Sequence, residues 1–164
     1  MITEITQRVS IDSKYLDSNI AHHLLKKIKE NMEGKCYLDY GYIIKVNNII
    51  NIGSNIISPA TLLTVYNVTY EADIIKPVKG IVLSGEICML FQQGIFVNIL
   101  EKMKVLIPEN NIEGYNFVDG IFVSEDKDKD DLILNTKVEI EITMVKYEKK
   151  SFSCIGKILS STET

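Results

Sequence analysis

The chain has 164 residues, of which 46% are apolar and 24% charged, and its formal net charge is −4. This composition excludes a disordered chain, allows one domain or two small ones, and argues against a protein whose binding energy comes mainly from phosphate contacts. No apolar run approaches the ~18 residues that span a bilayer, and the first residues lack the layout of a signal peptide, so we expect an intracellular protein.

The N-terminal residues predict one strand followed by one helix. Apolar and polar side chains alternate over residues 3–11, as in a strand with one buried face. Apolar residues then recur every three or four positions from Leu16 to Met32, which predicts an amphipathic helix capped by Asp12 or Ser13. Gly34 is the expected left-handed end of this helix.

After the helix, apolar residues again tend to occupy every second position. Residues 35–46 and 49–57 predict two strands separated by a turn at Asn47-Asn48, and residues 66–74 predict a long strand with one buried face. The order is therefore β-α-β-β-β, an α+β domain in which one helix covers an antiparallel sheet. Proline cannot donate a hydrogen bond to a continuing strand ladder, so we place the domain boundary at Lys76-Pro77 and the first domain at residues 1–76.

The second domain, residues 77–164, shows no helical period. We expect two or three strands over residues 79–107, a solvated polar loop at 125–131, and two strands over 136–159, which is the layout of an all-β OB-type barrel. Strands of a small barrel coil sharply, and a glycine permits the kinks and close backbone approaches that a Cβ would block. We assign this role to Gly80, Gly85 and Gly94.

No constellation of catalytic residues is recognisable, and we expect no catalytic site, no cofactor and no metal. The adjacent His22 and His23 point about 100° apart on a helix and cannot share an ion. The loop at 125–131 lacks the glycine and terminal glutamate of a calcium loop. The three cysteines are far apart and form no CxxC pair, which favours neither a disulfide framework nor a zinc site.

Several segments together resemble one protein family. Four features follow one another over nearly the full length of the chain. They are the helix-to-Gly34 junction, the Tyr40-Gly41-Tyr42-Ile43 segment, the Lys76-Pro77-x-x-Gly80 junction and the terminal Gly156. In this order they are similar to the stalk subunit of multisubunit DNA-dependent RNA polymerases, the family that comprises the seventh subunit of eukaryotic polymerase II and its archaeal counterpart.

The resemblance implies a tip domain that docks on the polymerase core, followed by an OB domain that reaches nascent RNA and initiation factors. It also implies a smaller helical partner subunit. Because the sequence has no apolar run long enough to span a bilayer, we expect no membrane contact. By position, the tip loop corresponds to residues 53–61. Apolar residues in a turn that cannot fold inward need another surface, so we expect core contacts at Asn55, Ile56, Ile57 and Pro59, although a locally packed loop is the alternative.

RNA-binding OB domains of the related ribosomal type usually carry aromatic residues around the third glycine of their sequence pattern. Phe96 matches one of these positions, whereas Gln93 stands where another aromatic is usual, so we expect weak binding. Lysines beside the third strand and around the last turn predict a small basic track, although scattered surface lysines would look the same. The predicted RNA-binding residues are Phe96, Lys102, Lys104, Lys146, Lys149 and Lys150.

The sequence therefore leaves two functions open. One is a non-catalytic stalk subunit of an RNA polymerase, located in the nucleus of a cellular eukaryote, or in the cytoplasm or virion for an archaeon or a large DNA virus. The alternative is a free-standing OB-type single-stranded RNA-binding protein of translation or RNA decay, which needs tight, salt-sensitive RNA binding of its own.

Overall fold

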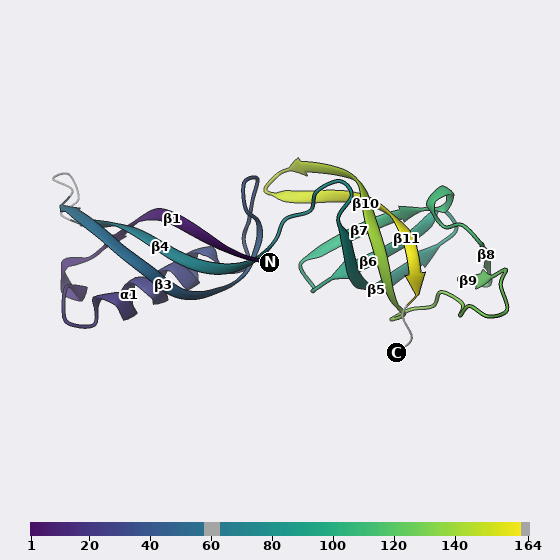
Figure 1. The fold of residues 1–164 in the computed structure, drawn as a ribbon, viewed down its shortest axis with the longest axis horizontal. Helices are drawn as coiled ribbons and strands as arrows, with labels where there is room; N and C mark the ends of the chain where they lie inside the picture. The colour runs from purple at the N-terminus through teal and green to yellow at the C-terminus, as the bar shows by residue number, and fades with distance from the viewer. Residues whose placement is uncertain (58–62, 162–164) are drawn as a thin grey trace. The chain divides into compact units, whose positions relative to one another are not determined.

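The structure, a computed structural model, describes residues 1–57 and 63–161 (Figure 1). The chain divides into two compact units, Met1–Lys76 and Pro77–Thr164. Within the described residues, no helix is long and apolar enough to cross a membrane. The fold class predicted from the sequence is confirmed: a β-α-β-β-β unit is followed by a closed five-stranded barrel.

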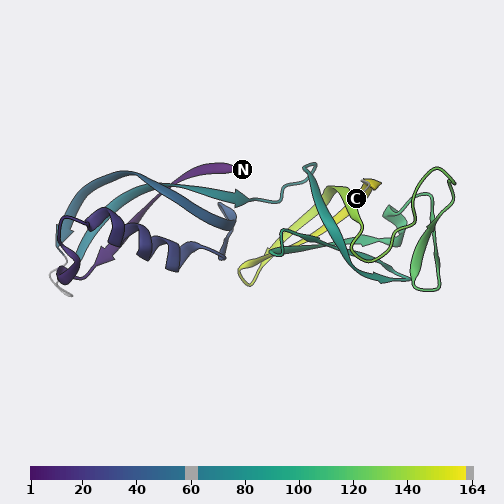
Figure 2. The ribbon, with the colours of Figure 1, turned by 90° about the horizontal axis from the view of Figure 1, so that it is seen from below.

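The N-terminal unit is an antiparallel sheet with a helix along one face (Figure 2). Its strands lie in the order β1-β4-β3-β2, and the helix packs mainly on β3. The core lies between the helix and the sheet and is formed by side chains of α1, β1, β3 and β4. The elements are β1 (Ile2–Ile11), α1 (Ile20–Met32), β2 (Cys36–Tyr37), β3 (Gly41–Ile57) and β4 (Thr64–Ile75).

The helix begins later than the sequence predicts. The Lys14 backbone N–H donates to the carboxylate of Asp12 (3.2 Å), which caps only a short 3-10 helix, Ser13–Tyr15. The carboxylate of Asp17 then accepts from the Asn19 N–H (2.8 Å), and α1 starts at Ile20. Such local bonds from Asp side chains stabilise turns in competition with helix. The predicted end is confirmed, since Gly34 has φ +79°.

The difference in helix start leads to a test with two leucines. Leu24 is fully buried under the sheet, whereas Leu16 lies before the helix and is 44% exposed. We expect Leu24→Ala to lower the free energy of unfolding by about 2–5 kcal/mol. Leu16→Ala should change it by less than about 0.5 kcal/mol. Denaturant unfolding of both variants measures the difference, and equal losses would contradict the observed helix start.

The predicted turn at Asn47-Asn48 is wrong, because β3 runs through both residues. The partners of β3 on β4 shift register four times, between Ile43 and Lys45 and at three later points. Each shift adds one residue to β3, so the residues opposite Ile74, Ala72, Tyr70 and Val68 recur every third position instead of every second. These helix-facing residues of β3 are Ile43, Val46, Ile49 and Ile52.

The C-terminal unit is a closed barrel whose strands pair in the order β10-β11-β7-β6-β5, with β10 also pairing with β5. All pairs are antiparallel except β11 with β7, which is the connectivity of an OB barrel. Inward-facing apolar side chains from all five strands fill the interior, and most of them are aliphatic. The strands are β5 (Val82–Phe91), β6 (Gly94–Ile99), β7 (Met103–Pro108), β10 (Lys137–Glu148) and β11 (Ser151–Ser161).

The segment between β7 and β10 contains a small hairpin that the sequence did not predict. Its strands β8 (Tyr115–Val118) and β9 (Ile121–Ser124) pair with each other and not with the barrel. The rings of Phe117 and Phe122 lie 5.2 Å apart, and Phe122 is buried and bridged to Leu132. The hairpin therefore has a small apolar centre of its own, followed by the polar loop at 125–131.

Candidate nucleic-acid interface on the barrel

Side chains on the outer face of β6 and β7 alternate with those that fill the barrel. Ile95 and Val97 are fully buried, so Phe96 between them points outward and is only partly covered. In the register Phe96 lies opposite Leu106 of β7 and Met89 of β5. The predicted aromatic position thus belongs to a partly exposed apolar row that crosses three strands.

A second aromatic residue joins Phe96 on this face. The ring of Phe91, at the end of β5, lies 5.7 Å from the ring of Phe96 with the planes tilted by 40°. Phe91 pairs with Gly94 across the β5–β6 turn, which brings it beside Phe96 although the two are five positions apart. We name Phe91 and Phe96 the aromatic pair. Sequence reasoning missed Phe91 because it searched for an aromatic immediately before Gly94.

Four of the predicted lysines lie at one end of the barrel. Strand β11 runs parallel to β7 with Cys154 opposite Val105, so both strands start at the same end. The β6–β7 turn and the β10–β11 turn therefore lie at that end. Each of the four lysines is exposed. They are Lys102, Lys104, Lys149 and Lys150.

Acidic neighbours reduce the positive charge at this end. Lys146, near the end of β10 just before the β10–β11 turn, lies 3.1 Å from the carboxylate of Glu148, and both side chains are more than half exposed. An exposed pair of this kind contributes little to stability but partly neutralises the lysine. Glu101 similarly precedes Lys102 in the β6–β7 turn. The lysines remain predicted RNA contacts.

The predicted docking residues lie at the far end of β3 in the N-terminal unit. Ile56 and Ile57 pair with Val65 and Thr64 of β4, yet each residue is 65% exposed. Asn55 precedes them and is also exposed. We name Asn55, Ile56 and Ile57 the tip; the fourth predicted residue, Pro59, lies outside the described residues.

Residues 6–85 match the family model described as "SHS2 domain found in N terminus of Rpb7p/Rpc25p/MJ0397". A Glycine max protein, DNA-directed RNA polymerase II subunit RPB7, is 24% identical over 164 residues, covering 94% of this chain and 89% of that protein. The Saccharomyces cerevisiae protein of the same name is 25% identical over 161 residues, covering 96% and 94%. The chain is Rpb7-like.

A further relative matches a smaller part of this Rpb7-like chain. The Schizosaccharomyces pombe DNA-directed RNA polymerase II subunit rpb7 is 28% identical over 100 residues, covering 60% of the chain and 58% of that protein. Among solved structures, the apo form of Mycoplasma genitalium RNase R has a TM-score of 0.38 at 18% identity, covering 47% of this chain and 13% of that one. A TM-score this low says nothing of function.

The aromatic pair of this Rpb7-like chain leads to a binding test. A base stacked on an aromatic side chain contributes about 1–3 kcal/mol, so Phe91→Ala and Phe96→Ala should each weaken binding of single-stranded RNA by that amount. Phe117→Ala is the matched control, because Phe117 also belongs to a tilted ring pair but lies in the β8–β9 hairpin. Fluorescence anisotropy with a labelled RNA measures all three variants. If Phe91→Ala behaves like the control, the aromatic pair is not a stacking surface.

Proposed function

We propose that this protein is a non-catalytic stalk subunit of a DNA-directed RNA polymerase. The observation that carries the proposal is the extent of the similarity, since relatives named as RNA polymerase II subunit 7 match over both structural units and nearly their own full length. The match of residues 6–85 to the Rpb7-type SHS2 domain, followed by a closed barrel, supports the same two-part organisation.

In this proposal the N-terminal unit docks on the polymerase core through the tip. Ile56 and Ile57 are large apolar side chains that the unit leaves 65% exposed at the end of a strand. Adjacent exposed apolar residues of this kind are typical of contact surfaces, because burying them against a partner removes apolar area from water. A smaller helical subunit is the further protein partner that we propose.

The barrel then holds nascent RNA weakly, on the aromatic pair and the predicted lysines, and contacts initiation factors. Weak binding is sufficient in this arrangement, because attachment to the polymerase raises the local concentration of RNA to about the millimolar range. The acidic net charge of −4 supports weak rather than tight binding. The subunit acts inside the cell, in the nucleus if the source is a cellular eukaryote.

Affinity purification of the tagged full chain from its native source tests the proposal. We expect the large RNA polymerase subunits and one small helical chain to co-purify, identified by mass spectrometry. Recovery of the chain without polymerase subunits would overturn the proposal.

The aromatic pair favours one second candidate, a free-standing single-stranded RNA-binding protein. That function requires micromolar or tighter binding by the isolated chain, weakened steeply by salt. Filter binding at two salt concentrations separates the candidates, because a polymerase-attached subunit needs only weak binding.

A further inference from the structure

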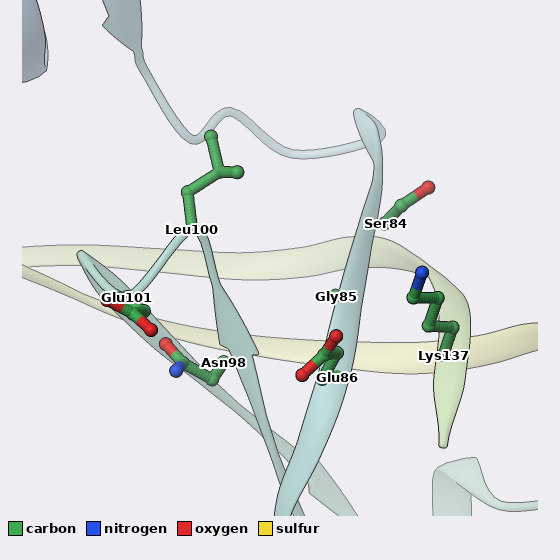
Figure 3. A pocket seen from close by; sticks show the side chains of 7 residues that line it. All are labelled: Ser84, Gly85, Glu86, Asn98, Leu100, Glu101 and Lys137. Atoms are coloured by element: carbon green, nitrogen blue, oxygen red, sulfur yellow. The ribbon is translucent and has the colours of Figure 1, made fainter. Parts of the chain in front are cut away.

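The barrel carries a polar recess that begins two residues along β6 from Phe96, at Asn98. It has a volume of ≈ 500 Å³ and lies on the outer face where β10, β5 and β6 meet the β6–β7 turn. In the register Glu86 of β5 lies between Lys137 of β10 and Asn98 of β6, so one row of side chains crosses the recess. Figure 3 shows these side chains, with Glu101 and Leu100 coming from the turn that follows β6. The recess is lined by Ser84, Gly85, Glu86, Asn98, Leu100, Glu101 and Lys137.

The lining offers acceptors and donors together. The carboxylates of Glu86 and Glu101 accept hydrogen bonds through two oxygens each, whereas the Asn98 amide both donates and accepts. The two carboxylates outnumber the single ammonium group of Lys137, so the lining is net negative and disfavours a phosphate group by charge repulsion. Within the described residues, no three His, Cys, Asp or Glu side chains are grouped to hold a metal ion. The recess therefore suits a neutral ligand that presents adjacent N–H donors.

Two of the predicted RNA contacts, Phe96 and Lys104, lie beside the recess. Asn98 lies two residues after Phe96 on the same face of β6, a separation of about 7 Å along a strand. Lys104 lies directly opposite Asn98 on β7 and is exposed. If one base of an RNA strand stacks on the aromatic pair, its phosphate would lie near Lys104. A neighbouring base would then reach the recess.

We propose that the recess binds the base of a guanine nucleotide in single-stranded RNA; this rests on the proposed RNA-binding role of the barrel. Single-stranded RNA is read through hydrogen bonds to the Watson–Crick edges of unstacked bases. Guanine alone presents two adjacent donors on that edge, N1–H and the N2 amino group, and one carboxylate accepts from both. Its O6 oxygen, next to them, accepts from a donor such as the Asn98 amide. Glu86, in the middle of the row, is the residue that we assign to the base.

The test compares short oligouridine RNAs that carry one central guanine, inosine, adenine or cytosine, measured by fluorescence anisotropy with the full chain. We expect the guanine RNA to bind about tenfold more tightly than the others. Inosine is the sharpest comparison, because it lacks only the N2 amino group. Glu86→Gln should remove the difference between guanine and inosine.

Glu109→Gln is the matched control, because it removes the same charge from an exposed residue in the 3-10 helix after β7, outside the recess. Its effect on all four RNAs measures the general influence of charge, and the guanine preference should persist. Equal binding of the four RNAs by the unchanged protein, or a guanine preference that survives Glu86→Gln, would overturn the proposal while leaving RNA binding intact. Absence of binding to every RNA would overturn both the proposal and the RNA-binding role.

Discussion

Replacing Gly94 with alanine is expected to destabilise the barrel by about 3 kcal/mol or more. A Cβ built on Gly94 would lie 2.3 Å from the carbonyl oxygen of Ile107 and 3.1 Å from the Cα of Pro108. Both atoms belong to the backbone of β7, which pairs with β6 at this position, so no side-chain rotation relieves the clash. Denaturant unfolding, with hydrogen exchange of the β6–β7 amides to report on the barrel, measures the loss.

Gly80→Ala provides the control from the same stretch of sequence. Gly80 has φ +91°, but a Cβ on it would meet no described atom within 4 Å. The substitution should therefore cost only the backbone strain, about 1–2 kcal/mol. Equal losses for the two variants would show that the close approach of β6 and β7 at Gly94 does not constrain the barrel.

The barrel could be predicted because its strands follow simple rules. Period-two alternation marks β6, where Ile95, Val97 and Ile99 are buried and the residues between them are not. The glycines at 85 and 94 lie where strands approach closely, since a Cβ on Gly85 would be 2.7 Å from the Asn98 carbonyl oxygen. Local sequence thus carried enough information to predict the strands, and the glycines indicated where two of them approach closely.

Strand β3 could not be predicted in the same way. Its helix-facing residues Ile43, Val46, Ile49 and Ile52 recur every third position, which is the period of neither a regular strand nor an α-helix. The bulges that produce this spacing depend on pairing with β4, more than twenty positions away in the register of Val46 with Ala72. The local sequence pattern therefore predicts a turn at Asn47-Asn48. In the structure, pairing with β4 continues the strand through these two residues.

The candidate interface, too, could be predicted from local sequence only in part. Phe96 was predictable from its place after Gly94, because the residues on either side of it alternate into the barrel. Phe91 becomes part of the surface only through the register that sets it opposite Gly94. The recess likewise needs Lys137, Glu86 and Asn98 from three strands. Contacts across strands require the register, which the alternation of a single strand does not give.

The double substitution Ile56→Asp with Ile57→Asp is expected to abolish polymerase docking. In the proposed complex both side chains are buried, and an anchor residue at the centre of an interface contributes about 2 kcal/mol or more. An aspartate at either position would in addition place an unpaired charge in the interface. We therefore expect docking to weaken by about a hundredfold or more, so that the large polymerase subunits no longer co-purify.

Ile50→Asp is the matched control, because Ile50 is a 47% exposed isoleucine of the same strand that lies away from the tip. It introduces the same charge into β3, so a general effect of aspartate on the strand would appear in both variants. Thermal unfolding should give similar stabilities for all three proteins, since the tip isoleucines contribute little to the core of their own unit. Retention of the polymerase subunits by the double variant would exclude the tip as the docking surface, whereas their loss with Ile50→Asp as well would extend the contact along β3.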